Sequence, residues 1–167
     1  MQATDKPIIR GFYLTSDQAR LLLEAKHGSF KLSLDLNMTE SEVTVRKGCV
    51  ELPGGRELAV RQLEEMAGKR KRVYVIEAEE PPEPLEIARE HYYKLSPTGG
   101  APTLEIDGIQ MHRTSGIDPF EDSRLKVQDT VRAGDVVLDT CGGLGYTAIW
   151  AARAGASSVV SVEVCSE

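Results

Sequence analysis

The segment VVLDTCGGLGYTAIWAARAGASSVVSVE, residues 136–163, constrains the fold of this chain more than any other part of the sequence. Its first apolar run, 136–138, predicts a strand that is buried on both faces. The alanine-rich run 146–154 predicts a helix, and a second apolar run, 159–162, predicts another strand. A strand, a helix and a strand in this order predict a parallel β-α-β unit with a right-handed crossover.

Glycines and acids stand where this unit would hold a ligand. Gly142, Gly143 and Gly145 follow the first strand, and each strand ends close to an acid, Asp139 or Glu163. Glycines let the backbone approach a ligand, and the next helix presents free N–H groups. An acid at the end of the second strand can accept hydrogen bonds from both ribose hydroxyls. We therefore expect the turn and both acids to converge on a nucleotide-type cofactor.

Two cofactors suit this pattern. The run 143–148, GLGYTA, matches the G-x-G-x-x-A dinucleotide fingerprint, with Glu163 at a suitable distance, so an NAD-binding protein is one interpretation. Asp139 argues against it, because a carboxylate at this place repels a pyrophosphate. S-adenosylmethionine has a positive amino group and no phosphate, so the same acid favours S-adenosylmethionine. A third interpretation is a structural β-α-β unit without a ligand.

The acid-glycine-acid set resembles the first motif and the ribose-binding acid of S-adenosylmethionine-dependent methyltransferases with a Rossmann-like fold. More narrowly, HRTSGIDPFED at 112–122 and DTC at 139–141 are similar to an uncharacterised group of archaeal predicted methyltransferases. The resemblance covers about residues 106–163. It implies that Asp139 lies near the amino group of the cofactor and Glu163 on its ribose. The implied cofactor site comprises Asp139, Cys141, Gly142, Gly143, Gly145 and Glu163, with Cys141 departing from the glycine usual in the family.

The hairpin predicted over residues 104–111, LEIDGIQM, supports a minor alternative. Asp-Gly favours the primed turns that match the twist of paired strands. The hairpin resembles one found in spermidine synthases, with Gln110 at the place of their glutamine. Those enzymes have a more glycine-rich first motif, so aminopropyl transfer stays a minor interpretation. After the hairpin, Asp118 and Pro119 predict the start of a helix over 119–131.

The remaining patterns predict an α+β N-terminal domain, residues 1–99, followed by residues 100–167 with the hairpin, a helix and an incomplete cofactor domain. The fold class is therefore α/β, in which the α+β domain precedes the opening β-α-β of a Rossmann-like methyltransferase sheet. Thr15 and Gln18 have the spacing of a capping box. Strands are predicted over 8–14, 31–36, 43–52 and 73–76, and helices from residue 15, over 58–67 and over 85–95.

The composition indicates which kinds of partner and which cellular compartment to expect. The net charge of −6 over 167 residues disfavours a nucleic-acid partner. No apolar stretch suits a signal peptide or a membrane span. Three cysteines have no metal-type spacing, and their odd number suits a reducing compartment, so we expect a cytoplasmic protein without a metal.

The sequence says little about the catalytic residues and the methyl acceptor. In the resembled family, the adenine-binding side chain and the substrate loop follow later strands, so the resemblance assigns neither a catalytic residue nor a methyl acceptor, and we expect a truncated methyltransferase. His112 and Arg113 could reach the cofactor or a substrate, but a structural or surface role is favoured. Capping is favoured for Asp118, Glu121 and Asp122.

An unpaired edge of strand 136–139 is expected to be covered by a second copy in a homodimer or by a partner chain. The rival interpretation is a non-enzymatic binding or assembly module, in which the N-terminal domain does the work and the half-sheet is a remnant. The early end of the sequence favours this module, whereas the acid-glycine-acid set favours the enzyme.

Overall fold

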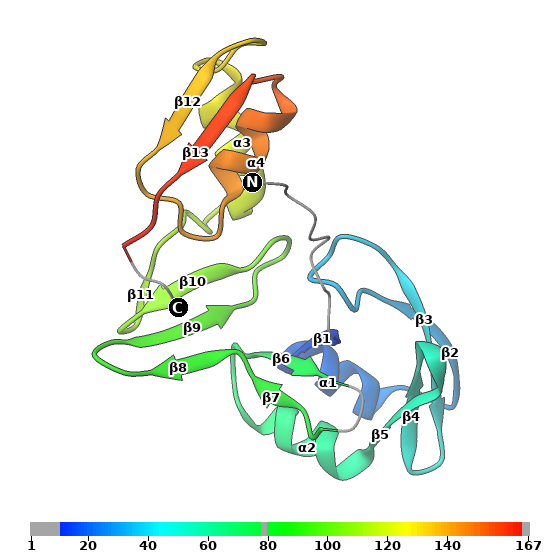
Figure 1. Cartoon of the computed structure of the whole chain (residues 1–167). Coiled ribbons are helices and arrows are strands. Elements are labelled where there is room, and N and C mark those ends of the chain that lie inside the picture. The colour runs from blue at the N-terminus through cyan, green and yellow to red at the C-terminus, as the bar shows by residue number, and fades with distance from the viewer. Residues whose placement is uncertain (1–10, 78–79, 165–167) are drawn as a thin grey trace. The chain divides into compact units, whose positions relative to one another are not determined.

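The computed structural model describes residues 11–77 and 80–164 and divides into two compact units, Met1–Leu85 (unit 1) and Glu86–Glu167 (unit 2). Both units combine helices with strands, which confirms the α/β class (Figure 1). The division falls before the boundary predicted at residue 99, which lies in the loop after a strand of unit 2. In the described parts of the chain, every helix is too short or too polar to cross a membrane.

The described residues of unit 1 form two antiparallel sheets and two α-helices. Strands β1, β6 and β7 form one sheet in the order β1-β6-β7, and β2-β3-β4-β5 form a second one as a meander. The elements are β1 (Phe12–Thr15), α1 (Ser16–Glu24), β2 (Gly28–Leu32), β3 (Ser41–Arg46), β4 (Cys49–Leu52), the 3₁₀ turn η1 (Pro53–Gly55), β5 (Arg56–Ala59), α2 (Val60–Gly68), β6 (Val73–Ile76) and β7 (Glu83–Pro84).

A capping box starts helix α1, and burial of its apolar side chains stabilises it. The predicted capping box is confirmed, because the Gln18 backbone N–H donates to the Thr15 hydroxyl (3.1 Å) and the Thr15 N–H donates to the Gln18 side chain (2.8 Å). Helices α1 and α2 pack together, and both contribute to one apolar core. That core comprises Leu14, Ala19, Leu22, Leu34, Val43, Val45, Val50, Leu52, Leu58, Leu63, Met66, Tyr74 and Ile76.

Strand boundaries in unit 1 differ from the predictions where pairing decides them. The strand predicted over 31–36 instead spans Gly28–Leu32, where it pairs with β3. Leu34 is buried in the loop that follows β2. Its apolar side chain continues the alternating pattern of residues 31–36 beyond the end of the strand, so the pattern predicted the wrong boundaries. The helix predicted from residue 58 begins at Val60, because the preceding residues pair with β4 as β5. The first part of the strand predicted over 8–14 lies outside the described residues.

Unit 2 consists of a small antiparallel sheet followed by a β-α-β unit. The sheet has the order β11-β10-β9-β8, and β12 pairs in parallel with β13. The elements are β8 (Glu86–Ala88), β9 (Tyr92–Ser96), β10 (Thr103–Ile106), β11 (Ile109–Gln110), α3 (Pro119–Gln128), β12 (Val136–Asp139), α4 (Tyr146–Arg153) and β13 (Ser158–Ser161).

The helix predicted over 85–95 is wrong. This segment forms β8 and β9 instead. Strand β9 pairs with β8 on one side and with β10 on the other, and the Tyr92 N–H donates to the Asp107 carboxylate (2.8 Å). Partners from distant positions therefore override the helical spacing of this segment.

The predictions for the hairpin and for the start of α3 are confirmed. Asp107 and Gly108 both have positive φ angles, 49° and 84°, as the turn between β10 and β11 requires. Asp118 caps α3 by accepting hydrogen bonds from the N–H groups of Phe120 (2.9 Å) and Glu121 (3.2 Å). The helix ends at Gln128, three residues before the predicted end at 131.

The parallel β12–β13 pair and the helix between them are confirmed, but the expected burial of β12 on both faces is wrong. Figure 1 shows α3 and α4 behind the two strands, on one face of the pair. On the other face, Val136 is 78% exposed and Leu138 is 64% exposed. One helical layer covers this pair, so the continuous apolar run is only half buried.

Candidate functional site

The turn after β12 lines a pocket of about 410 Å³ within unit 2. This volume lies within the range of roughly 300–1,000 Å³ that small-molecule sites occupy. The turn, the start of α4 and the residue Glu163 after β13 form one side, and α3, strands β9 and β10 and the loop after β11 supply the rest. Of the six predicted site residues, four line this pocket, namely Cys141, Gly142, Gly143 and Glu163.

The glycine turn depends on glycine for two separate reasons. Gly142 is buried against β13, because its N–H donates to the Val162 carbonyl (2.9 Å) and an added Cβ would lie 2.5 Å from the Ser161 hydroxyl. Gly143 and Gly145 have φ angles of 49° and 75°, which L side chains rarely adopt. Gly145 is the N-cap of α4. It therefore shapes the turn rather than lining the pocket.

Asp139 braces the turn from within. Its carboxylate accepts hydrogen bonds from the Thr147 hydroxyl (2.8 Å), the Ser161 hydroxyl (3.3 Å) and the Cys141 N–H (3.4 Å). These contacts connect the end of β12 to α4 and β13. The structure thus brings Asp139 to the turn, as the sequence predicted, and gives its carboxylate three partners within the fold.

Glu163 is the acid that reaches the pocket. It follows β13, and its carboxylate accepts hydrogen bonds from the Gly143 N–H (2.7 Å) and the Val164 N–H (2.8 Å). The predicted convergence of the glycine turn with the second acid is therefore present, across 20 residues of sequence. A carboxylate held in this way is a strong hydrogen-bond acceptor for ligand hydroxyls.

Strands β9 and β10, together with the residue after β11, contribute an apolar wall that was not predicted from the sequence. Tyr93, Leu104, Ile106 and Met111 form this wall. Leu104 and Ile106 alternate along β10, so their shared face was the available signal. Gln110, the residue of interest in the spermidine synthase resemblance, is exposed and accepts a hydrogen bond from the Thr114 hydroxyl.

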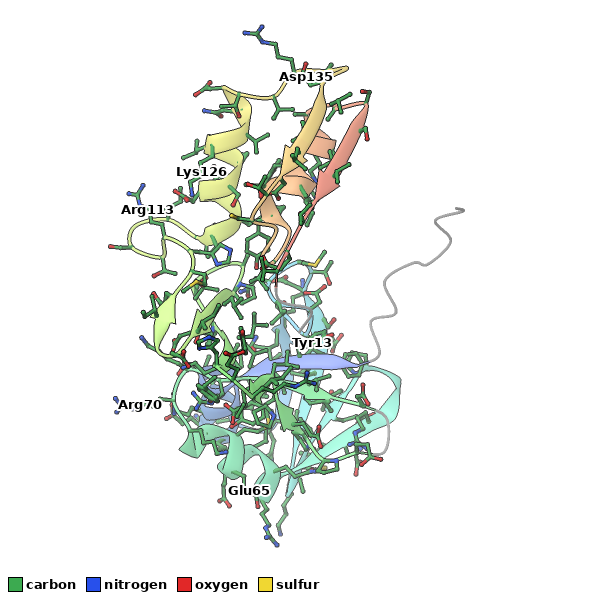
Figure 2. The ribbon with its side chains drawn as sticks, turned by 60° about the vertical axis from the view of Figure 1, so that its left-hand side comes forward. Tyr13, Glu65, Arg70, Arg113, Lys126 and Asp135 are labelled. Carbon is green, nitrogen blue, oxygen red and sulfur yellow. The ribbon has the colours of Figure 1, made fainter. Side chains whose placement is uncertain are left out.

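Charged residues of α3 pair with one another beside the pocket. Lys126 lines the pocket, and its ammonium lies 2.6 Å from the Asp122 carboxylate. Arg113 lies 3.8 Å from the same carboxylate, and Figure 2 shows Arg113 and Lys126 on one side of unit 2. Glu121 pairs with Arg124, whose hydrogen bonds hold the pKa of the Glu121 carboxyl below its usual value. Capping is thus confirmed for Asp118, whereas its two acidic neighbours form ion pairs.

Tyr146 and His112 form the aromatic corner of the pocket, with ring centroids 5.3 Å apart. The Tyr146 hydroxyl donates to the Pro102 carbonyl (2.8 Å). Burial, with a smaller contribution from Asp118, raises the pKa of Tyr146 to about 12. Burial and then Lys126 lower the pKa of His112, against the opposing effect of Asp122. Both side chains are therefore neutral at pH 7.

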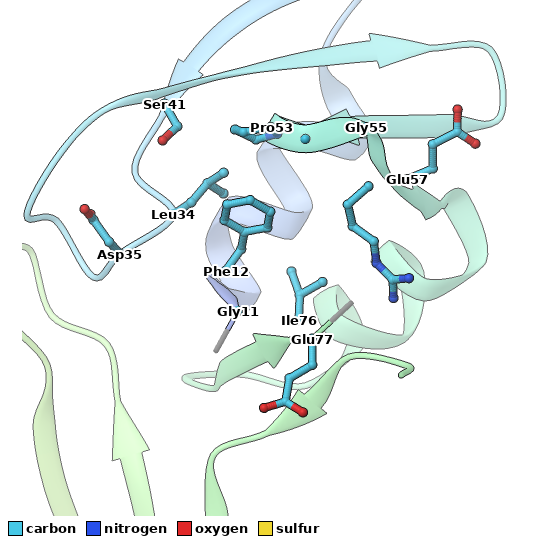
Figure 3. Close-up of a pocket in the computed structure, with 12 residues that line it drawn as sticks. Gly11, Phe12, Leu34, Asp35, Ser41, Pro53, Gly55, Glu57, Ile76 and Glu77 are labelled. Atoms are coloured by element: carbon cyan, nitrogen blue, oxygen red, sulfur yellow. The ribbon is translucent and has the colours of Figure 1, made fainter. Parts of the chain in front are cut away.

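Unit 1 contains a larger pocket of about 810 Å³. Figure 3 shows Phe12, Leu34 and Ile76 near its centre, with the acids Asp35 and Glu57 further out. Burial raises the pKa of Asp35, but hydrogen bonds from its loop, chiefly from Thr39, outweigh it and leave the pKa below its usual value. The Asp35 carboxylate thus holds its own loop together. All six predicted site residues belong to the other unit.

Comparison with known proteins gives one informative similarity. No protein-family model matches the chain. An uncharacterised protein of Methanocaldococcus jannaschii, MJ1233, is 39% identical to it over 156 residues, which is 90% of this chain and 53% of that protein. The chain thus spans about half the length of the curated relative it matches. Since that relative is uncharacterised, the similarity carries no activity to this chain.

Proposed function

We propose that unit 2 contains the S-adenosylmethionine-binding part of a methyltransferase whose acceptor is unidentified. The observation that carries this proposal is the Glu163 carboxylate, held 2.7 Å from the Gly143 nitrogen in a pocket with an apolar wall. An adenosyl group combines a flat, largely apolar base with two ribose hydroxyls. The wall suits the base, and the carboxylate suits the hydroxyls.

The electrostatics of the turn favour this cofactor over a dinucleotide. Asp139 and Glu163 both place carboxylates at the turn, and the Gly143 N–H already donates to one of them. A pyrophosphate would approach these negative charges, whereas Lys126, the cation that lines the pocket among the described residues, is paired with Asp122. A cofactor without phosphate avoids this repulsion, so NAD is the less favoured ligand.

The roles of this chain would be binding and orientation. S-adenosylmethionine supplies a methyl group on a positively charged sulfur, and catalysis of its transfer depends mainly on alignment with the acceptor. Glu163 would hold the ribose, and the glycine turn would let the ligand approach the backbone. Asp139 keeps the turn in shape. Its expected contact with the amino group of the cofactor stays a prediction.

Calorimetric titration of the 167-residue chain tests the proposal directly. We expect saturable binding of S-adenosylmethionine and of S-adenosylhomocysteine, and none of NAD⁺ at the same concentrations. Glu163→Gln should weaken both by roughly tenfold to a hundredfold, because hydrogen bonds to a charged group contribute about 1.5–3 kcal/mol. The matched control is Glu57→Gln in the pocket of unit 1, which should bind like the wild type. Unchanged affinity in Glu163→Gln, or preferred binding of NAD⁺, would contradict the proposal.

A non-enzymatic binding module is the second candidate, and the pocket of about 810 Å³ in unit 1 supports it. In that case none of the three compounds should release heat on titration. Aminopropyl transfer finds little support, since Gln110 is exposed and bonded to Thr114. The free thiols of Cys49 and Cys141 suit a reducing compartment, which supports a cytoplasmic location.

The exposed face of the β12–β13 pair supports a protein partner. Besides Val136 and Leu138, this pair of strands and the residue after it expose Val160 (52%) and Val162 (49%). Parallel strands are normally covered on both faces, so we propose that a second copy or a partner chain covers this face. Sedimentation velocity should show concentration-dependent association that Leu138→Asp abolishes, and a monomer at every concentration would exclude the second copy.

A further inference from the structure

One ring nitrogen of His112 contacts strand β10 of the antiparallel sheet in unit 2. Its Nδ1 atom lies 3.0 Å from the hydroxyl of Thr103, a residue that is fully buried in β10. That hydroxyl also lies 3.2 Å from the Leu104 carbonyl, to which it donates. A hydroxyl has one proton to give, so when the Thr103 hydroxyl donates to the Leu104 carbonyl it accepts from the Nδ1–H group. In this arrangement His112 is the tautomer with its proton on Nδ1 and a lone pair on Nε2.

The second ring nitrogen is left for a ligand in the pocket. His112 lines the pocket and its Nδ1 contacts the buried Thr103, so Nε2 is the ring nitrogen that remains for a hydrogen bond to a bound molecule. Within residues 11–77 and 80–164, His112 makes its hydrogen bond through Nδ1, and no described group occupies Nε2. The Tyr146 ring packs against the imidazole at 5.3 Å and restricts its rotation. The result is an oriented lone pair beside the glycine turn.

Burial and the charged groups around the imidazole keep it neutral. Burial disfavours the imidazolium most and lowers the pKa of His112, Lys126 on α3 adds to this effect, and Asp122 on α3 opposes it. On α4, Tyr146 is itself neutral and donates its proton to the Pro102 carbonyl. On β10, the Thr103 hydroxyl carries no charge. A neutral imidazole with a free lone pair is a competent proton acceptor at pH 7.

We propose that His112 accepts the proton of the methyl acceptor, and that the acceptor group is therefore an O–H or an N–H. This inference rests on the proposed function. In the transfer, a lone pair of the acceptor oxygen or nitrogen forms the bond to the methyl carbon. The carbon–sulfur bond breaks and its electron pair stays on sulfur, which becomes neutral. The acceptor proton moves to Nε2 of His112 and from there to solvent. Thr103 is the positioning residue, since it keeps the proton on Nδ1.

The first test is long-range ¹H–¹⁵N NMR of the labelled 167-residue chain. His112 should show the Nδ1–H tautomer and titrate below the ordinary histidine value of about 6.5. Thr103→Ser retains the hydroxyl and should preserve this tautomer. Thr103→Val leaves Nδ1 without a partner and should shift the population towards Nε2–H. An Nε2–H tautomer in the wild type would overturn the proposal.

The second test probes the acceptor side with S-adenosylhomocysteine at saturation. Phenol, which has an O–H group, should move the Nε2 resonance of His112, whereas anisole, its methyl ether, should not. The phenol response should persist in Thr103→Ser and disappear in Thr103→Val. Equal responses to phenol and anisole, or no response to either, would overturn the proposal. Failure of S-adenosylhomocysteine to bind contradicts the proposed function, while binding together with the Nε2–H tautomer contradicts the role of His112 alone.

Discussion

Unit 1 surrounds a continuous apolar core, whereas unit 2 buries a set that is largely polar. The core of unit 1 draws on both helices and on strands from both of its sheets. In unit 2, the buried apolar side chains among the described residues include Val127 and Ala151. Over residues 86–164, the buried polar side chains are Lys94, Ser96, Thr103, Asp122 and Ser123.

This difference shows how the two units divide stability and recognition. Apolar burial contributes about 25 cal/mol per Å² and has no directional preference, which suits a core such as that of unit 1. Buried polar groups must instead find specific partners, and those partners orient His112 and Lys126 at the pocket of unit 2. Meanwhile unit 2 leaves apolar strand residues exposed, Val136 and Leu138 among them. Unit 1 thus buries the larger apolar core, whereas unit 2 exposes the apolar face of its parallel strands.

The largest expected effect compares two strand leucines, one in each unit. Leu58 is 0% exposed and Leu138 is 64% exposed. Leu58→Ala should lower the free energy of unfolding by about 2–5 kcal/mol, because it removes contacts and leaves a cavity. Leu138→Ala should change it by less than about 0.5 kcal/mol, as for other exposed substitutions. Urea unfolding followed by circular dichroism at low protein concentration measures both. Equal losses of unfolding free energy in the two variants would show that the outer face of β12 is covered, and the contrast between the two units would no longer hold.

A substitution in the glycine turn should have the next largest effect. Gly142→Ala places a Cβ against the Ser161 hydroxyl and should destabilise unit 2 by about 1–3 kcal/mol, as overpacking generally does. Trp150, the single tryptophan, lies on α4, so its fluorescence reports on the unfolding of unit 2. Adding Ser161→Ala removes the clashing atom and should restore part of the loss. Independent, additive effects of the two substitutions would refute the steric reason.

Helix caps should show no difference between the units, because a cap is a local interaction. Thr15→Ala in unit 1 and Asp118→Ala in unit 2 should each cost about 0.5–2 kcal/mol. Glu64→Ala, on the exposed side of α2, serves as the control and should stay within about 0.5 kcal/mol of the wild type. Urea midpoints give all three values. A large cost in one unit alone would mean that caps depend on the surrounding core.

The smallest effect concerns pH. The folded pKa of Tyr146, about 12, lies above the ordinary value of 10.0, so the folded state retains the proton that the unfolded state releases first. This contribution to stability is complete below pH 10 and is lost as the pH rises towards 12. Between pH 9 and about 11, the unfolding free energy of the wild type should therefore fall more steeply than that of Tyr146→Phe. Parallel slopes would show that the phenol is not protected by burial.

Patterns of residues close together in the sequence were sufficient to predict a substantial part of the fold. The capping box at Thr15, the Asp107–Gly108 turn and the N-cap at Asp118 are each formed by residues within four positions of one another, and all three are present. The β-α-β unit follows from its apolar runs and glycine turn. In the candidate site, the meeting of Glu163 with Gly143 was also predictable, because both follow the carboxyl ends of neighbouring parallel strands.

The sequence by itself thus determined the local elements and the place where the acids and the glycine turn meet. Only the tertiary structure decided that Tyr92 belongs to a strand, that Asp139 contacts α4 and β13, and that His112 lines the pocket with its Nδ1 on Thr103. It also decided that one face of β12 is exposed. The physical reason is range. Caps and turns depend on neighbours along the chain, whereas strand pairing, burial and side-chain orientation depend on partners that only folding brings together.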